Sequence, residues 1–254
     1  KAGHDVKIFD LDSESVKRAE KKGAKPAISL RDVTNEAQTV ITMLPAGQHV
    51  RDVYLGEEGL IASAGEGTLF VDSSTIDVES ARSVHEAAAN EGFDMLDAPV
   101  SGGVGGAESG NLTFMCGGPQ TAFDRAKPTL DVMGSTVVHA GPAGNGQVAK
   151  ICNNMLLGAS MIATCEAFVL AEKLGLDHQK LFDISSTASG QCWAMTSYCP
   201  VPGPVPTSPA NRNYEAGFTA AMMLKDLRLA QNAAATVGAA NPIGVMAAAL
   251  YALF

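Results

Sequence analysis

Short runs of β-branched and other apolar residues alternate with amphipathic stretches through residues 5–140. This alternation is typical of a parallel sheet whose strands are connected by helices. We expect strands at residues 6–9, 39–43, 68–71, 93–96, 112–115 and 136–138. Helices are expected at residues 13–22 and 77–90, because a capping Asp77 opens the second and Gly23 and Gly92 follow the two ends. The first half of the chain is therefore predicted to be α/β.

The β-branched runs stop after the segment Gly141-Pro142-Ala143-Gly144. Residues 147–174 then form one long pattern rich in Ala, Leu and Met that ends at Gly175. Further helices are expected at residues 177–187, 219–237 and 243–254, with a proline-rich loop at residues 199–209. We therefore predict two domains, an α/β domain over residues 1–141 and an all-α domain over residues 142–254, joined by a long helix.

Charge and composition exclude several classes of protein. The 254 residues carry 18 Lys and Arg against 27 Asp and Glu, so the net charge is −9, and no basic patch is concentrated along the chain. Such a balance repels phosphate backbones and anionic lipid, so neither nucleic acid nor a membrane surface is an expected partner. Hydrophobic residues at 46% and charged residues at 18% indicate a soluble globular protein and exclude a disordered chain.

Cysteine and histidine spacing indicates no metal site. The five cysteines are an odd number with no C-x-x-C pair, and the five histidines show no ligand spacing. Neither a structural zinc site nor a full disulfide framework is predicted, and a reducing compartment is expected. No uninterrupted run of about 18 apolar residues is present, so a membrane span is not expected either.

Asp10 follows the first expected strand, residues 6–9. In a dinucleotide-binding βαβ unit, an acidic residue about 20 positions after a glycine fingerprint binds the adenosine ribose. That fingerprint would lie before Lys1, and both ends of the chain read as if cut within helical patterns, so we expect the protein to extend beyond them. A ribose-binding carboxylate would repel a 2′-phosphate and favour NAD over NADP. The alternative is an Asp that starts the turn into the next helix.

Small polar residues follow two other expected strands. Residues 42–45 read Thr-Met-Leu-Pro and residues 72–75 read Asp-Ser-Ser-Thr. Ligands of open α/β sheets bind beyond the carboxyl ends of strands, so a nicotinamide ribose would fit there. Ordinary Ser/Thr turn chemistry is the alternative.

Residues 97–106 read Asp-Ala-Pro-Val-Ser-Gly-Gly-Val-Gly-Gly. The glycines would free the backbone to direct N–H groups at an anion, and Ser101 adds a hydroxyl, so a carboxylate would fit. A glycine-rich surface loop without a ligand is the alternative.

Two lysines stand in apolar helical patterns. Lys150 and Asn154 are four residues apart and project from one helical face. A Lys among apolar neighbours can have a lowered pKa, as proton transfer requires, although a helical Lys is most often a surface charge. Lys225, followed by Asp226, interrupts the apolar run 218–229 and needs an internal ion pair or an anionic cofactor.

Together and in this order, these motifs resemble the β-hydroxyacid dehydrogenase family over essentially the whole chain. The family-wide segments are 43–45, 72–75, 97–103 with 110–113, 144–154 and 225–227. Residues 189–193, 198–203 and 213–218 resemble the hydroxyisobutyrate branch more than the tartronate-semialdehyde reductases. The resemblance implies a Rossmann-type N-terminal domain whose first strand and glycine-rich turn precede Lys1. It also implies a helical C-terminal domain, an active site between the two, and a homodimer or homotetramer formed largely through the helices.

The same resemblance implies roles for individual residues. Lys150 is the catalytic residue that exchanges a proton with the substrate hydroxyl, while a hydride moves between the substrate and NAD. The substrate is bound by Ser101, Gly102, Gly103 and Asn154. The cofactor contacts are Leu44, Pro45, Thr75 and Lys225, in addition to Asp10, and no metal is involved.

The expected activity is NAD-dependent oxidation of 3-hydroxyisobutyrate to methylmalonate semialdehyde, as in valine breakdown. A sibling enzyme acting on tartronate or succinic semialdehyde shares every family-wide motif. A non-catalytic nucleotide-binding oligomer would use the same fold, since fold does not determine function. Family members are cytoplasmic in bacteria and mitochondrial in eukaryotes, and residues 189–209 with the Ala-rich helices resemble a bacterial member.

Overall fold

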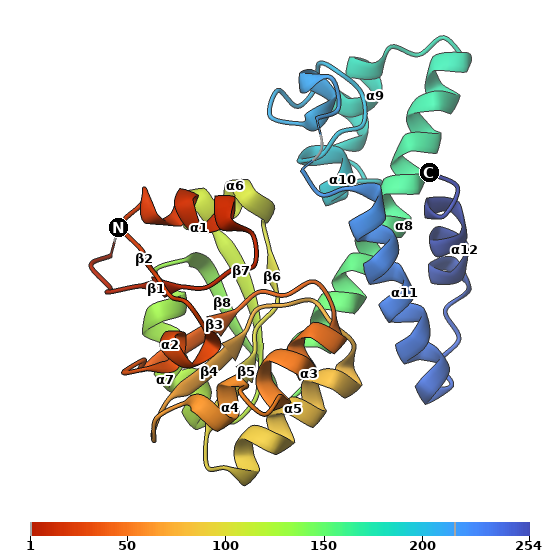
Figure 1. Ribbon diagram of the computed structural model, residues 1–254. Helices are drawn as coiled ribbons and strands as arrows, with labels where there is room; N and C mark the ends of the chain where they lie inside the picture. Colours follow the sequence, from red (N-terminus) through yellow and green to blue (C-terminus); the bar gives the residue numbers. More distant parts are fainter. Residues whose placement is uncertain (1, 216) are drawn as a thin grey trace. The chain divides into compact units, whose positions relative to one another are not determined.

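The computed structural model of the chain describes residues 2–215 and 217–254. It contains two compact units, Lys1–Lys150 and Ile151–Phe254, and each is described separately (Figure 1). The boundary expected after residue 141 stays a prediction, because one helix continues from the first unit into the second.

The first unit is built on a mixed sheet with the strand order β3-β4-β5-β7-β6 and β8 beside β7. These strands are β3 (Thr39–Thr42), β4 (Leu69–Asp72), β5 (Asp94–Asp97), β6 (Val100–Ser101), β7 (Leu112–Gly117) and β8 (Gly134–Gly141). A separate parallel pair joins β1 (Lys7–Ile8) to β2 (Lys25–Pro26). All six expected strands are present, and five of them agree with the expected ends to within two residues. β8 continues three residues beyond its expected end at residue 138, and β2 and β6 were not anticipated.

The expectation of a parallel sheet is correct for β3, β4 and β5 and for β7 with β8. It is wrong in the middle of the sheet, where β7 runs antiparallel to both β5 and β6. Residues 102–111 between β6 and β7 are too few for the crossover of a dozen or more residues that a parallel pair needs. The chain therefore turns back on itself after β6.

The described part of the first unit contains seven helices before α8 (Figure 1). They are α1 (Ser13–Glu20), α2 (Leu30–Thr34), α3 (Gly47–Leu55), α4 (Leu60–Ser63), α5 (Val78–Asn90), α6 (Gly103–Ser109) and α7 (Gln120–Leu130). The two helices that were predicted are α1 and α5. The side chain of Asp77 accepts a hydrogen bond from the backbone N–H of Ser80, which confirms the expected N-cap of α5.

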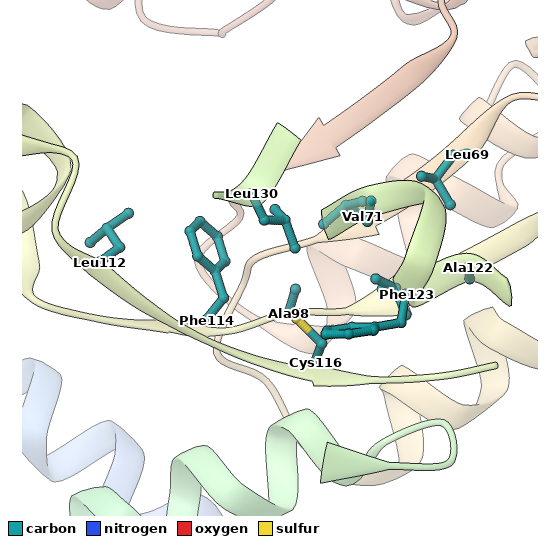
Figure 2. Close-up of a cluster of buried hydrophobic side chains, with 11 residues drawn as sticks. Leu69, Val71, Ala98, Leu112, Phe114, Cys116, Ala122, Phe123 and Leu130 are labelled. Carbon is teal, nitrogen blue, oxygen red and sulfur yellow. The ribbon is translucent and has the colours of Figure 1, made fainter. Parts of the chain in front are cut away.

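Alternating side chains of the central strands enter two separate cores, as the two-residue period of a strand requires. Leu69 and Val71 of β4 lie in one core with residues of β7 and α7, which converge on this face in Figure 2. Phe70 of β4 and Met95 of β5 lie in the other core, with residues of α3, α4 and α5. Because helices cover both faces, all four residues of β4 are buried.

The second unit contains only helices among its described residues, which confirms the expected all-α domain. They are α8 (Asn145–Lys173), which begins in the first unit, α9 (His178–Ser185), α10 (Trp193–Thr196), a 3-10 helix (Pro209–Arg212), α11 (Ala220–Val237) and α12 (Pro242–Tyr251). Leu227 of α11 packs against α8 at Gly158, where an added Cβ would lie 3.1 Å from Leu227 Cδ2. By length and composition alone, α8 is apolar enough to cross a membrane.

Candidate active site

Lys150 is a buried residue of the first turns of α8, with only 6% of its surface exposed. Its Nζ atom donates a hydrogen bond to the carbonyl oxygen of Val100, 2.7 Å away. The structure thus brings together α8 and β6, which are 50 residues apart along the chain. The alternative interpretation of Lys150 as a solvated surface charge is wrong, and its amine lies against the residue that precedes Ser101.

The segment that contains Ser101 differs from the expected glycine-rich loop. Ser101 ends β6 and is partly buried, Gly102 forms a turn, and the short helix α6 begins at Gly103. Gly102 has φ +129°, and an added Cβ would lie 3.2 Å from Leu112 Cδ2. A side chain is therefore disfavoured at Gly102 by both backbone conformation and space. Gly102 and Gly103 are themselves exposed.

A hydrogen-bonded network joins the carboxyl ends of β3 and β4. The Asp72 carboxylate accepts hydrogen bonds from Thr42 Oγ1 at 2.7 Å and from Ser74 Oγ at 2.5 Å. Ser74 Oγ in turn accepts from the backbone N–H of Leu44 at 2.8 Å. Burial raises the pKa of the Asp72 carboxyl above its usual value. Residues 72–75 were recognised as a motif from the sequence, but no role was expected for Asp72 itself, although an acidic residue at the end of an apolar strand was a usable signal.

The expected cofactor contacts lie at the same strand ends. Leu44 and Thr75 are partly buried and Pro45 is exposed. Ser73 Oγ is buried and has no hydrogen-bond partner within the described part of the chain. Because the carboxyl edge of a parallel sheet is where such folds bind nucleotides, an unpaired buried hydroxyl there fits a polar group of a nicotinamide dinucleotide.

Asp10 lies two residues beyond β1 and is exposed. One of its carboxylate oxygens accepts a hydrogen bond from the backbone N–H of Asp12 at 2.8 Å. Asp12, and not Asp10, caps α1 by accepting from Glu14 and Ser15. Asp10 thus takes part in the turn into α1, and its second oxygen has no such bond in the described residues.

In the second unit, Asn154 of α8 and Asp226 of α11 are each 2% exposed. Asn154 Nδ2 donates to Asp226 Oδ2 at 2.5 Å, and Lys225 Nζ lies 3.4 Å from Asp226 Oδ1. The Lys225 side chain is 39% exposed, so the charge buried on this helix is the carboxylate and not the ammonium that we expected. Of the two alternatives for Lys225, the ion pair is present.

No group of three or more His, Cys, Asp or Glu side chains within residues 2–215 and 217–254 could hold a metal ion.

Two family models together match almost the whole chain. Residues 1–141 match the NAD-binding domain of 6-phosphogluconate dehydrogenase. Residues 144–254 match a domain described as NAD-binding of NADP-dependent 3-hydroxyisobutyrate dehydrogenase.

Individual relatives agree with these models. A probable 3-hydroxyisobutyrate dehydrogenase of Mycobacterium tuberculosis is 50% identical over 253 residues, covering 100% of this chain and 85% of that protein. The NAD-dependent L-serine dehydrogenase of Pseudomonas aeruginosa is 47% identical over the same share of each chain. A solved structure of the M. tuberculosis 3-hydroxyisobutyrate dehydrogenase with L-serine superimposes with a TM-score of 0.94 at 50% identity, covering 100% of this chain and 86% of that one. The chain therefore belongs to the β-hydroxyacid dehydrogenase family, which includes the 3-hydroxyisobutyrate dehydrogenases and whose members are oxidoreductases that use a nicotinamide dinucleotide.

Proposed function

We propose that this protein oxidises 3-hydroxyisobutyrate to methylmalonate semialdehyde with NAD, as a step of valine breakdown. The observation that carries the proposal is the buried Lys150, whose amine lies 2.7 Å from the carbonyl oxygen of Val100, the residue that precedes Ser101. A buried ammonium stabilises the alkoxide that develops when hydride leaves a carbinol carbon.

Lys150 is the proton-transfer residue in this proposal. In the oxidation, its neutral amine accepts the proton of the substrate hydroxyl while the carbinol carbon loses a hydride and becomes a carbonyl carbon. In the reverse direction, the ammonium returns that proton to the oxygen. The Val100 carbonyl accepts one N–H of Lys150 and so limits the rotation of the amine. Acid–base catalysis of this kind contributes about 10² to 10⁴ in rate.

The nicotinamide cofactor supplies the hydride acceptor when it is bound. We propose that Leu44, Pro45 and Thr75 hold it at the carboxyl ends of β3 and β4, where Asp72 and Ser74 order the two loops. Asp10 would bind the adenosine ribose through its carboxylate and disfavour a 2′-phosphate. Lys225, whose side chain is partly exposed, would contact the cofactor near its nicotinamide end.

The substrate contacts that we propose are Ser101, Gly102 and Gly103 for the carboxylate and Asn154 for orientation. The 2.5 Å bond to Asp226 supports the role of Asn154, because it holds the amide in one orientation. The Asn154 amide oxygen accepts a hydrogen bond from Asn153 Nδ2 at 3.0 Å, and its second lone pair would accept one from the substrate.

L-Serine is the strongest second substrate, because it too is a 3-hydroxy acid. The 47% identical relative is named an L-serine dehydrogenase, and the M. tuberculosis structure contains L-serine. Tartronate and succinic semialdehydes are the substrates of the sibling enzymes. A non-catalytic nucleotide-binding protein is less well supported, since it would have no use for a buried Lys150.

We also propose a homodimer or homotetramer in the cytoplasm of a bacterium. Several apolar side chains of α8 and α12 are exposed in the single chain, including Leu156 at 67%, Leu170 at 61% and Ile243 at 69%. Burial of such side chains against a second copy would be favourable. Light scattering on the purified protein measures the assembly directly.

The test is NADH formation by the full-length protein with NAD and either 3-hydroxyisobutyrate, L-serine, glycerate or 4-hydroxybutyrate. We expect the highest kcat/KM with 3-hydroxyisobutyrate. A preference for L-serine would replace the substrate but keep the mechanism, and no turnover with any of the four would support the non-catalytic alternative. Lys150→Ala is expected to lower kcat by about 10² to 10⁴ while NADH still binds. Near-normal turnover of this variant would refute the proposed role of Lys150.

A further inference from the structure

We infer that Asp97, together with Gln147, is a positioning residue that holds the first turn of α8 against the sheet and thereby places the amine of Lys150. The inference rests on the proposed catalytic role of Lys150. Neither Asp97 nor Gln147 was identified as a site residue from the sequence.

The Asp97 carboxylate caps α8 from another element of the fold. Asp97 ends β5, and its side chain is 1% exposed. Its Oδ1 atom accepts a hydrogen bond from the backbone N–H of Gly144 at 2.7 Å, and Oδ2 accepts from that of Gln147 at 2.9 Å. The first N–H groups of a helix have no partner within the helix, and a side chain at the N-cap position usually satisfies them. Gly144 precedes α8 and has no side chain, so Asp97 takes that role.

Gln147 attaches the same turn to the segment that follows β4. It is fully buried, and its Oε1 accepts from the backbone N–H of Ile76 at 3.0 Å. Its Nε2 donates to the carbonyl oxygen of Ser74 at 2.8 Å. The start of α8 is therefore attached to β5 through Asp97 and to the segment that follows β4 through Gln147.

The donor and the acceptor of the Lys150–Val100 hydrogen bond each lie close in sequence to Gln147 or Asp97. Lys150 lies three residues after Gln147 on α8, and Val100 lies three residues after Asp97. The carboxylate thus connects the helix that carries the amine to the strand that carries its acceptor, the Val100 carbonyl, 2.7 Å away. A displacement of α8 by about 1 Å at this point would move the amine relative to Ser101, and misplacement on this scale can cost about 10²-fold in rate.

The variant Asp97→Asn tests this role with almost no change in volume. An amide offers one acceptor oxygen where the carboxylate offers two, so either Gly144 N or Gln147 N would face an NH₂ group. His85 also faces this side chain, with Nε2 3.1 Å from Oδ1. We expect kcat to fall by about 10 to 10²-fold, while substrate KM and the Kd for NADH stay within about twofold.

Asp94→Asn is the matched control, because Asp94 begins the same strand and pairs with Arg125 at 2.6 Å, at the opposite end from Asp97. We expect wild-type kcat for this variant. The pH profile of kcat/KM separates positioning from general loss of structure: its limb that reports Lys150 should shift in Asp97→Asn and not in Asp94→Asn.

Two results would overturn the role of Asp97: an Asp97→Asn enzyme with unchanged kcat and pH profile, or a loss of activity matched by an equal loss of NADH binding. If Asp97→Asn does not fold, Gln147→Met decides, since it removes both side-chain bonds at similar volume. It must lower kcat selectively, and unchanged kcat would refute the inference. The proposed function has a separate test: an active Lys150→Ala enzyme would refute it. An inactive Lys150→Ala enzyme together with a fully active Asp97→Asn enzyme would refute only the positioning role of Asp97.

Discussion

Gly146→Ala provides a sensitive test of how closely α8 approaches the sheet. Replacing Gly by Ala inside a helix ordinarily stabilises a protein by about 1 kcal/mol, because Ala loses less backbone entropy on folding. At Gly146, however, the added Cβ would lie 2.6 Å from the carbonyl oxygen of Asp97 and would also overlap the carbonyl oxygen of Met115. Both obstacles are backbone atoms, which cannot move aside as the end of a flexible side chain does.

The structure therefore predicts that Gly146→Ala destabilises the protein, whereas helix propensity alone predicts that it stabilises the protein. Overpacking costs about 1 to 3 kcal/mol. Because the added Cβ would contact two backbone oxygens, the cost of Gly146→Ala should lie in the upper half of that range. Subtracting the gain in helix propensity leaves a net decrease of about 1 to 2 kcal/mol in the free energy of unfolding. For a protein of this size, each kcal/mol corresponds to about 2 to 4 °C, so Tm should fall by about 2 to 8 °C.

Gly105→Ala is the matched control, because Gly105 lies in α6 and an added Cβ would meet nothing within 4 Å. Thermal unfolding followed by circular dichroism should show a higher Tm for Gly105→Ala and a lower Tm for Gly146→Ala. In addition, Gly146→Ala should lower kcat, since relief of the overlap moves the helix that carries Lys150. A Tm for Gly146→Ala equal to or above that of the wild type would refute the close approach of α8 to β5 and β7.

Two further predictions concern acidic side chains. The wild-type enzyme should have a higher kcat/KM with NAD than with NADP. Asp10→Ser should lower the ratio of kcat/KM with NAD to kcat/KM with NADP. Equal efficiency of the wild type with both cofactors would show that Asp10 is only a turn residue. The second prediction concerns pH. The pKa of Asp72 is raised in the folded state above 3.8, so the folded protein holds this proton more tightly than the unfolded chain. Its contribution to the free energy of unfolding therefore decreases as pH rises from 3.8 through the folded pKa. Asp72→Asn removes this pH-dependent contribution, so the variant should become more stable relative to the wild type as the pH rises from 4 to 7 in urea titrations. A difference in the free energy of unfolding that stays constant over this range would contradict the raised pKa of Asp72.

The elements with strong local signals were predictable. The β-branched runs became β3, β4, β5, β7 and β8. Asp77 and Thr219 each cap the helix that follows them, by accepting from Ser80 and Met222 respectively. These features depend on contacts between residues a few positions apart, which is why the order of residues along the chain reveals them.

Weak local signals were misleading. The glycines of residues 102–106 indicated a loop, but the chain forms a turn at Gly102 and then the helix α6. Glycine permits many backbone conformations, so composition alone does not distinguish a loop from a short helix supported by its neighbours. The short helices α2 and α4 were missed for a related reason, since four or five residues are too few to show a helical period.

The sequence by itself determined that an α/β half precedes a helical half, and that Lys150, Asn154 and the Ser101 segment belong to a recognisable set of motifs. Only the tertiary structure decided that Lys150 is buried, that Asp226 and not Lys225 carries the buried charge, and that Asp97 caps α8. Burial and capping of this kind depend on residues 47 to 72 positions apart, such as Asp97 with Gly144 and Asn154 with Asp226. Such pairs form only once the sheet and helices have packed, because no local preference of either residue favours its distant partner.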